Sequence, residues 1–413
     1  MRFVNNSKFA LPPFILYFCL APLATAARQT QQSPITAPAA PFQFAFSGNV
    51  AQVPVEISDH LVLVPIRVNG ARPSWFLLDT TRPTSSLDDV RAVALGLLSH
   101  GSAGSKVLSN AVLDFPSLKI SIPSLALDSF GDLSSRVGRA IQGILGADVL
   151  SHLIVVISYD RQTLQFYDPK SFQYKGAGIK LKMQLLNGVP AFDVKFSVRH
   201  RGTLHGLFSI ATAQAEAVQF YSSFAAAHKF SELGQKMILF SPLDSPGDFD
   251  DHLGRIDSVQ FGKITLQDPF AIFPGKSEHA SAQPSSSGIA GAIGGEILDR
   301  FTVVLDSPDQ SVIFEPNPHF NDLFVSDMSG LVLVATPPDF RAFGVSRVIE
   351  KSPAELVGIA VGDMLEKIDG NPASDYSLGD LRALFRQDGT EHTLTVLRNG
   401  KHLQFTLKLK PLI

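Results

Sequence analysis

One acidic residue has the sequence context of a catalytic turn. Asp79 follows the apolar pair Leu77-Leu78 and precedes Thr80-Thr81, so we expect a strand that ends in a tight polar turn and presents a carboxylate. A carboxyl group held in such a turn can take or give a proton in acid–base catalysis. The corresponding turn in the second half of the chain, Ala211-Thr212-Ala213, carries no acid.

The two halves of the chain are related by an internal repeat, and this relation identifies the corresponding turns. Residues 143–157, which begin Gly-Ile-Leu-Gly-Ala-Asp-Val-Leu, align without gaps on residues 291–305, which begin Gly-Ala-Ile-Gly-Gly-Glu-Ile-Leu. Upstream, residues 76–81 align on residues 208–213 in the same order. Two matched pairs in one order predict two duplicated lobes with a cleft between their polar turns.

The other residues that could do chemistry do not form a recognisable site. The glycines of residues 288–295 are explained by the repeat, and no P-loop lysine follows them. The 11 histidines lack the His-Glu-x-x-His spacing of zinc hydrolases, and there is no Gly-x-Ser-x-Gly elbow. A loop with four aspartates matches no EF-hand, which favours a solvated loop over a calcium site: Asp244, Asp248, Asp250 and Asp251. We therefore predict no metal and no cofactor.

Composition and charge restrict the class of protein. A chain of 413 residues, of which 45% are apolar and 18% charged, can form two or three domains with substantial cores. The formal net charge of -3, without a long run of Lys or Arg, disfavours nucleic acid and anionic membrane surfaces as partners. Short alternating apolar segments predict a mainly β protein, for example residues 61–68, 118–122, 153–157 and 301–305.

The N-terminus has the three parts of an export signal. Arg2 and Lys8 precede an apolar run at residues 9–23, and Ala24-Thr25-Ala26 offers a cleavage site. We predict a signal peptide at 1–26, a flexible leader at 27–45, no membrane span after cleavage, and a periplasmic or extracellular location. A retained anchor is the weaker alternative, because prolines interrupt the run. The one cysteine, Cys19, lies in the signal, so we expect no disulfide or thiol chemistry in the mature chain.

The first half of the chain resembles the pepsin-like and retropepsin-like aspartic proteases. Their catalytic loop reads apolar-apolar-Asp-Thr-Gly and is followed by apolar-apolar-Gly, as in Leu77-Leu78-Asp79-Thr80-Thr81 and Ile144-Leu145-Gly146. The resemblance implies a bilobal double-β-barrel domain with lobes at 46–180 and 181–318. In that family one aspartate from each lobe shares a proton with the other, and the pair acts on a water and the peptide carbonyl.

The sequence departs from the family pattern in ways that bear on catalysis. Ala211 stands where the family has its second aspartate, and a methyl group neither takes nor gives a proton. Asp79 then loses the like-charged neighbour that splits the two acidities. Thr81 and Ala213 replace glycines whose amides approach the carboxylates in the family. Thr80 and Thr212 are both kept, and in the family these threonines hydrogen-bond across the lobe junction.

The C-terminal part of the chain resembles PDZ domains of the kind that follow many exported bacterial proteases. The resemblance covers about residues 328–410 and rests on turn-forming segments in one order, at 329–333, 345–348, 352–354, 362–363 and 368–370. PDZ domains add a peptide end as a strand and take its carboxylate with loop amides. The resemblance therefore implies a peptide-binding loop and strand at Gly330, Leu331, Val332 and Leu333.

Three hypotheses for function follow. The first is a non-catalytic or impaired aspartic-protease homologue that binds extended polypeptides or protein C-termini, in which Asp79 is a remnant acid or only an acceptor within its own turn. The second is an active aspartic-type endopeptidase, formed by a dimer of Asp79 loops or by Glu216 moving into reach. The third is a structural scaffold of the cell envelope. The sequence leaves the oligomeric state open.

Overall fold

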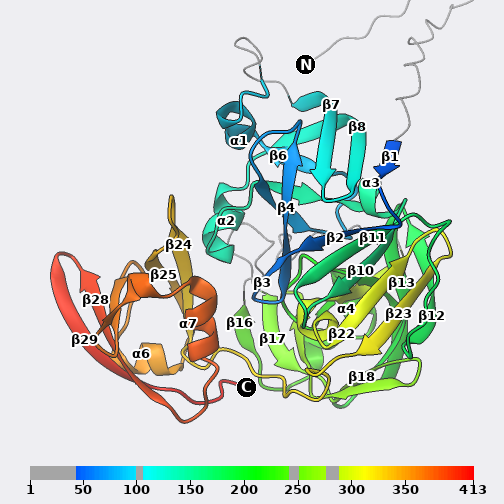
Figure 1. Ribbon diagram of the computed structural model, residues 1–413. Coiled ribbons are helices and arrows are strands. Elements are labelled where there is room, and N and C mark those ends of the chain that lie inside the picture. The colour runs from blue at the N-terminus through cyan, green and yellow to red at the C-terminus, as the bar shows by residue number, and fades with distance from the viewer. Residues whose placement is uncertain (1–42, 99–105, 241–250, 276–287) are drawn as a thin grey trace, which may run out of the picture. The chain divides into compact units, whose positions relative to one another are not determined.

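The computed structural model describes residues 43–98, 106–240, 251–275 and 288–413. Within these ranges the chain is mainly β, as the sequence predicts, with short helices between the strands (Figure 1). The signal at 1–26, with Cys19, lies outside them. The leader ends earlier than the predicted residue 45, because strand β1 (Gln43–Phe46) begins at Gln43 and its two phenylalanines pack against the core.

The first sheet carries the Asp79 turn at the end of strand β5. In chain order its strands are β1, β3 (Glu56–Ser58), β4 (Leu61–Val68), β5 (Ser74–Leu78), β6 (Ser86–Asp88), β7 (Val107–Phe115), β8 (Leu118–Asp128) and β9 (Gly143–Leu145). Their spatial order is β1-β8-β6-β9-β5-β4-β3, with β7 paired to β4 and β8. Strand β5 runs parallel to β9, with Phe76 opposite Gly143.

The second sheet carries the Ala211 turn at the end of strand β14. Its strands are β2 (Val50–Pro54), β10 (Ile154–Ser158), β11 (Thr163–Tyr167), β12 (Ile179–Leu186), β13 (Val189–Val198), β14 (Gly202–Ile210), β15 (Val218–Phe220), β16 (Ile238–Phe240), β17 (Asp251–Arg255), β18 (Ser258–Phe261), β19 (Ile264–Gln267), β20 (Phe270–Phe273), β21 (Ile289–Ile293), β22 (Phe301–Asp306) and β23 (Ser311–Pro316). Strand β14 runs parallel to β21, with Phe208 opposite Gly291. This pairing repeats that of β5 with β9.

In each copy of the repeat, a glycine lies against the ring of an equivalent phenylalanine. A Cβ added at Gly143 would stand 2.3 Å from the Phe76 ring. A Cβ added at Gly291 would stand 2.6 Å from the Phe208 ring and 2.1 Å from the Gln219 carbonyl oxygen. The first glycine of the repeated Gly-apolar-apolar-Gly pattern therefore has a steric cause, because in both copies it admits an aromatic ring that a side chain would exclude.

The two halves are joined by the last strands of the repeat. Strand β10 pairs antiparallel with β22, its counterpart, and Val156 lies opposite Val304. Strand β11 pairs in turn with β2. Strands from both predicted lobes thus share one sheet, and one core cluster extends from Ala51 to Phe324. The lobe boundary predicted between 180 and 181 falls inside β12, whose first half pairs with β23 and whose second half pairs with β13.

The C-terminal domain has a sheet and a core of its own. Its strands are β24 (Leu331–Thr336), β25 (Ala342–Val348), β26 (Met364–Ile368), β27 (Asn371–Pro372), β28 (Glu391–Arg398) and β29 (Lys401–Lys408). The order is β24-β25-β26-β28-β29, with β27 paired to β26. Strand β24 therefore stands at the end of the sheet. A separate apolar cluster, which includes Leu331, Phe343 and Leu381, fills this domain.

The helices are short. They are α1 (Asp89–Ala94), α2 (Gly131–Val137), α3 (Ala147–Leu150), α4 (Ser222–Ala227), α5 (Gly295–Leu298), α6 (Pro353–Val357) and α7 (Leu378–Leu384), with 3-10 turns at Phe230–Glu232 and Ala373–Asp375. Helix α7 begins with a reciprocal capping box between Ser377 and Asp380. Among the described residues, no helix has the length and apolar character needed to cross a membrane.

Substitution of Gly291 by Ala should destabilise the protein by roughly 2–4 kcal/mol, because the new methyl group meets a backbone oxygen that cannot move away cheaply. The measurement is the free energy of unfolding from chemical denaturation. Gly48→Ala is the matched control, since a Cβ there meets nothing within 4 Å, and its effect should stay within about 0.5 kcal/mol. Equal stability of the two variants would contradict the steric explanation of the repeat.

Candidate functional site

The turns after β5 and β14 occupy equivalent positions in the two lobes. The Asp79 N–H donates to the Leu145 carbonyl at 3.0 Å, and the Ala211 N–H donates to the Ile293 carbonyl at 2.9 Å. Each bond links a turn to the apolar-apolar-Gly strand of its own lobe. Within the chain, Ala211 therefore stands at the position in the second lobe that corresponds to Asp79 in the first.

Two threonines connect the turns to each other. The Thr80 N–H donates to Thr212 Oγ1 at 3.2 Å, and the Thr212 N–H donates to Thr80 Oγ1 at 3.3 Å. Thr212 Oγ1 donates to the Leu78 carbonyl at 2.7 Å, and Thr80 Oγ1 donates to the Ile210 carbonyl. Both side chains are buried. This reciprocal set of bonds holds the two loops together across the lobe junction.

The Asp79 carboxylate is engaged within its own turn. Its Oδ1 accepts hydrogen bonds from the Thr81 N–H at 2.9 Å, the Thr81 hydroxyl at 2.7 Å and the Arg82 N–H at 3.1 Å. Thr81, at the position of the family's glycine, thus turns its side chain towards the acid. Such bonds fix the orientation of the carboxylate.

In the described part of the second lobe, no acid lies at the meeting point of the turns. Ala211, Ala213 and Ala215 are at most 8% exposed and pack in apolar clusters. Glu216, the alternative acid, lines a cavity together with Asp59 instead. A single carboxyl group cannot act as base on a water and as acid on a carbonyl in the same step. The two equivalent turns therefore present one carboxylate, that of Asp79, among the described residues.

The glycine loop before β24 is occupied by groups of its own chain. The N–H groups of Ser329 and Gly330 donate to Asp327 Oδ1 at 2.8 and 3.3 Å, and the Leu331 N–H donates to the Ser329 hydroxyl at 3.0 Å. The sequence predicted that amides of this loop, around Gly330 and Leu331, are free to take a peptide carboxylate. In the structure a ligand carboxylate at these amides would have to compete with Asp327 and Ser329. Val332 and Leu333 continue from the loop into β24.

Asp327 is a buried acid within this loop. Burial raises the pKa of its carboxyl group to about 6, although hydrogen bonds from Ser329 and Gly330 favour the charged form. The loop that leads into β24 therefore changes its charge in the weakly acidic range.

An apolar cavity of about 160 Å³ lies at the end of the groove between β24 and α7. Leu331, Leu333 and Phe385 of the C-terminal domain form one side of it, and Ile238 and Phe240 of strand β16 contribute to its wall. The cavity has the size of one large apolar side chain. It is thus a place for a single residue, bordered by two domains.

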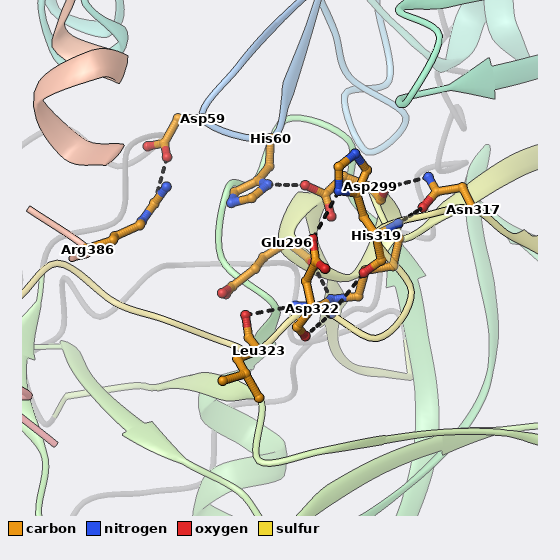
Figure 2. Close-up of polar contacts among 10 residues, drawn as sticks. Asp59, His60, Glu296, Asp299, Asn317, His319, Asp322, Leu323 and Arg386 are labelled. Atoms are coloured by element: carbon orange, nitrogen blue, oxygen red, sulfur yellow. Dashed lines mark hydrogen bonds and ion pairs between the residues drawn. The ribbon is translucent and has the colours of Figure 1, made fainter. Parts of the chain in front are cut away.

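Asp59 links the first lobe to helix α7. It lies between β3 and β4, and its carboxylate accepts a hydrogen bond from Arg386 at 2.8 Å (Figure 2). It accepts a second one from Arg382 at 3.1 Å. The Asp59 side chain is 8% exposed. Burial alone would raise the pKa of Asp59, but the two guanidinium groups and His60 hold it well below its usual value. We call this charged set of Asp59, Arg382 and Arg386 the Asp59 clasp.

A polar cavity of about 400 Å³ adjoins the clasp. In it His60 pairs with the Asp299 carboxylate, as Figure 2 shows. Burial would lower the pKa of His60, but the hydrogen bond to Asp299 and its negative charge raise it above the ordinary value. Burial also raises the pKa of Glu296, which lines both cavities. These groups surround the junction of the lobes with the C-terminal domain.

The segment that leads into the C-terminal domain is held by Arg300. Its guanidinium group donates to the carbonyl oxygens of His319 at 3.3 Å and Asp322, and lies 3.8 Å from the Phe324 ring. The side chain of His319 also pairs with Asp322 at 3.0 Å (Figure 2). The connection between the domains is thus an ordered part of the structure.

The structure gives no support for a metal site in the part of the chain that it describes. No group of three or more His, Cys, Asp and Glu side chains is placed to hold an ion there. Of the four aspartates in the loop discussed above, Asp251 is described, and its carboxylate accepts a hydrogen bond from the Gly275 N–H at 2.9 Å. Asp244, Asp248 and Asp250 lie outside the described residues.

Sequence reasoning missed the Asp59 clasp. Arg382 and Arg386 are four residues apart, the first in α7 and the second just after its end, and this spacing was a detectable signal for a cationic stripe. Nothing in the sequence connects that stripe with an aspartate more than 300 residues earlier. His60 and Asp299 were missed for the same reason.

The comparisons with known proteins agree with part of this description. Residues 344–398 match the PDZ domain family, which confirms the PDZ domain predicted at the C-terminus. Among solved structures the chain is similar to an aspartic proteinase from Irpex lacteus, with 13% identity, a TM-score of 0.41, and coverage of 66% of this chain and 99% of that chain. No curated protein matches the sequence. A structural likeness of this degree says nothing about activity.

Removal of either threonine hydroxyl from the lobe junction should cost roughly 2–4 kcal/mol, because buried main-chain groups lose their partners. We expect the Thr80→Val and Thr212→Val effects to sum to more than that of the double variant, since both changes break the same bonds. The coupling energy between the two threonines is obtained from the unfolding free energies of the native protein, the two single variants and the double variant. Thr302→Val, at a buried position in β22, is the control with a small effect, and strict additivity would argue against a shared network.

Asp327→Asn should change how stability depends on pH. The folded protein holds the Asp327 proton more tightly than the unfolded chain, so the contribution of Asp327 to the free energy of unfolding is greatest below about pH 4 and is lost as the pH rises through about 6. Asparagine keeps an oxygen acceptor and does not ionise. Between about pH 4 and 7 the variant should therefore gain on the order of 1–3 kcal/mol relative to the native protein. Parallel stability curves would contradict a raised pKa at this site.

Proposed function

We propose that this chain is an exported aspartic-protease-like protein whose lobes do not hydrolyse peptides and whose PDZ domain binds polypeptide C-termini. The observation that carries the loss of hydrolysis is the position of Ala211, whose backbone corresponds to that of Asp79 in the facing turn. The remaining carboxylate is bonded to Thr81 in its own turn. Shared-proton chemistry needs two adjacent carboxyl groups, and this arrangement supplies one.

The PDZ domain supports the binding half of the proposal. Strand β24 stands at the end of its sheet, where an extended peptide can be added by main-chain hydrogen bonds. The apolar cavity beside Leu331 and Phe385 can receive the terminal side chain of such a peptide. Export rests on the three-part pattern of residues 1–26, which favours a periplasmic or extracellular protein.

The native protein should leave an unstructured protein substrate uncut from pH 3 to 8, because the second acid is missing. Ala211→Asp should create slight activity at acid pH that disappears when Asp79→Ala is added. Ala211→Asn is the matched control, since it has nearly the same size and cannot exchange a proton. Cleavage products are followed by mass spectrometry.

The opposite result would identify an active aspartic endopeptidase. If the native protein cuts the substrate and Asp79→Ala abolishes the cleavage, the conclusion drawn from Ala211 is wrong. If cleavage survives Asp79→Ala, an aspartic mechanism at this turn is wrong as well.

A further inference from the structure

The groove between β24 and α7 is filled at one end by the first lobe. Helix α2 lies beside β24. Gly138, which ends α2 in a left-handed conformation, comes so close to α7 that a Cβ added there would stand 2.4 Å from the Leu378 Cβ. Ala140 packs against the core of the PDZ domain. We call residues 131–141 the plug segment.

The plug segment is a fixed part of the first lobe. Arg139 pairs with Glu56, and its guanidinium group lies 4.5 Å from the Trp75 ring. Ser134 bonds the Ile141 N–H at 2.9 Å and closes the segment on itself. The segment therefore cannot leave the groove alone, and the groove opens only when the PDZ domain moves away from the lobe.

One arginine holds both the plug and the clasp. Arg382 Nη2 donates to the Arg136 carbonyl at 2.7 Å, and its Nη1 donates to Asp59 at 3.1 Å. The Arg382 side chain is 17% exposed. Without Asp59, Arg382 and Arg386 would lose the carboxylate that they share in this partly buried contact. Glu296 and Asp327 would remain as weaker counter-charges of Arg386. Separation of the domains, which returns these charges to water, would then be favoured.

The position of the plug conflicts with the way a PDZ domain binds a chain. Strand addition uses the free edge of β24 and the space between β24 and α7 over several residues. The plug takes part of that space, and the cavity of about 160 Å³ left beside Leu331, Leu333 and Phe385 has room for one side chain. A terminal residue fits in the docked state, and the residues before it do not.

We propose that the plug segment inhibits the PDZ domain within the same chain, and that a polypeptide C-terminus binds along β24 only after the Asp59 clasp has opened. This inference rests on the proposed function of the PDZ domain. A ligand that binds only the open form must supply the free energy of opening. Its apparent dissociation constant is therefore that of the open form divided by the fraction of molecules that are open. If about 1% of molecules are open, the observed dissociation constant is about 100-fold above that of the open form.

The test measures peptide binding and groove opening on the full mature chain. The binding probe is a pool of fluorescein-labelled decapeptides of randomised sequence that end in a free Leu, Ile, Val or Phe carboxylate, and the same pool with amidated ends is the blank. The variants are Asp59→Asn and, from the other side of the contact, Arg386→Gln. Asp309→Asn is the matched control, because it removes one negative charge from an exposed pair with Lys180. Hydrogen exchange reports on residues 131–141 and on β24.

We expect Asp59→Asn and Arg386→Gln to bind the pool at least tenfold more tightly than the native protein, and Asp309→Asn to match the native protein. Amides of residues 131–141 and β24 should exchange at least tenfold faster in the two clasp variants. Equal binding by all four proteins would overturn the inhibition and leave the proposed function standing. If none of the four proteins binds the pool, the proposed peptide binding is wrong. Hydrogen exchange then tests the clasp by itself, and unchanged amide protection in both clasp variants would overturn its role.

Discussion

Two buried threonine hydroxyl groups, each bonded to the main chain of the other lobe, fix the point at which the halves of this protein meet. Thr80 bonds the end of β14 and Thr212 bonds the end of β5, while β10 and β22 pair nearby as the last strands of the repeat. These bonds use hydroxyl and backbone groups. The alanine at position 211 takes no part in these side-chain bonds, so the junction of the two halves does not depend on an acid there.

Much of the fold was predictable because the repeat has local steric causes. The glycines at 143 and 291 must accept the rings of Phe76 and Phe208, and that requirement is written in the sequence as a spacing. The boundaries of the leader and of the lobes were less predictable. Gln43 was assigned to a leader although its neighbours Phe44 and Phe46 find a core to pack on. The predicted lobe boundary crosses β12, because strand pairing and not composition decides where that segment belongs.

The site was predictable at its loops and not at its domain contacts. The sequence identifies Asp79, Ala211 and the two threonines, since each belongs to a repeated pattern. It could not reveal that Asp327 and Ser329 occupy the amides of the PDZ loop, because an acid two residues before a serine is common in any turn. The Asp59 clasp joins residues more than 300 positions apart. Such contacts follow from how finished domains pack, which no short pattern encodes.

The place of β24 at the end of its sheet has a further consequence. This strand reads Leu-Val-Leu-Val-Ala-Thr, and an apolar strand with an unpaired edge is a template for pairing with other copies of the chain. Helix α2, lying beside β24, therefore also covers a strand that could otherwise pair with another copy of the chain. In a crowded compartment, self-association stays limited as long as this edge is exposed only briefly. Lasting exposure would favour aggregates, whose amount would grow with protein concentration.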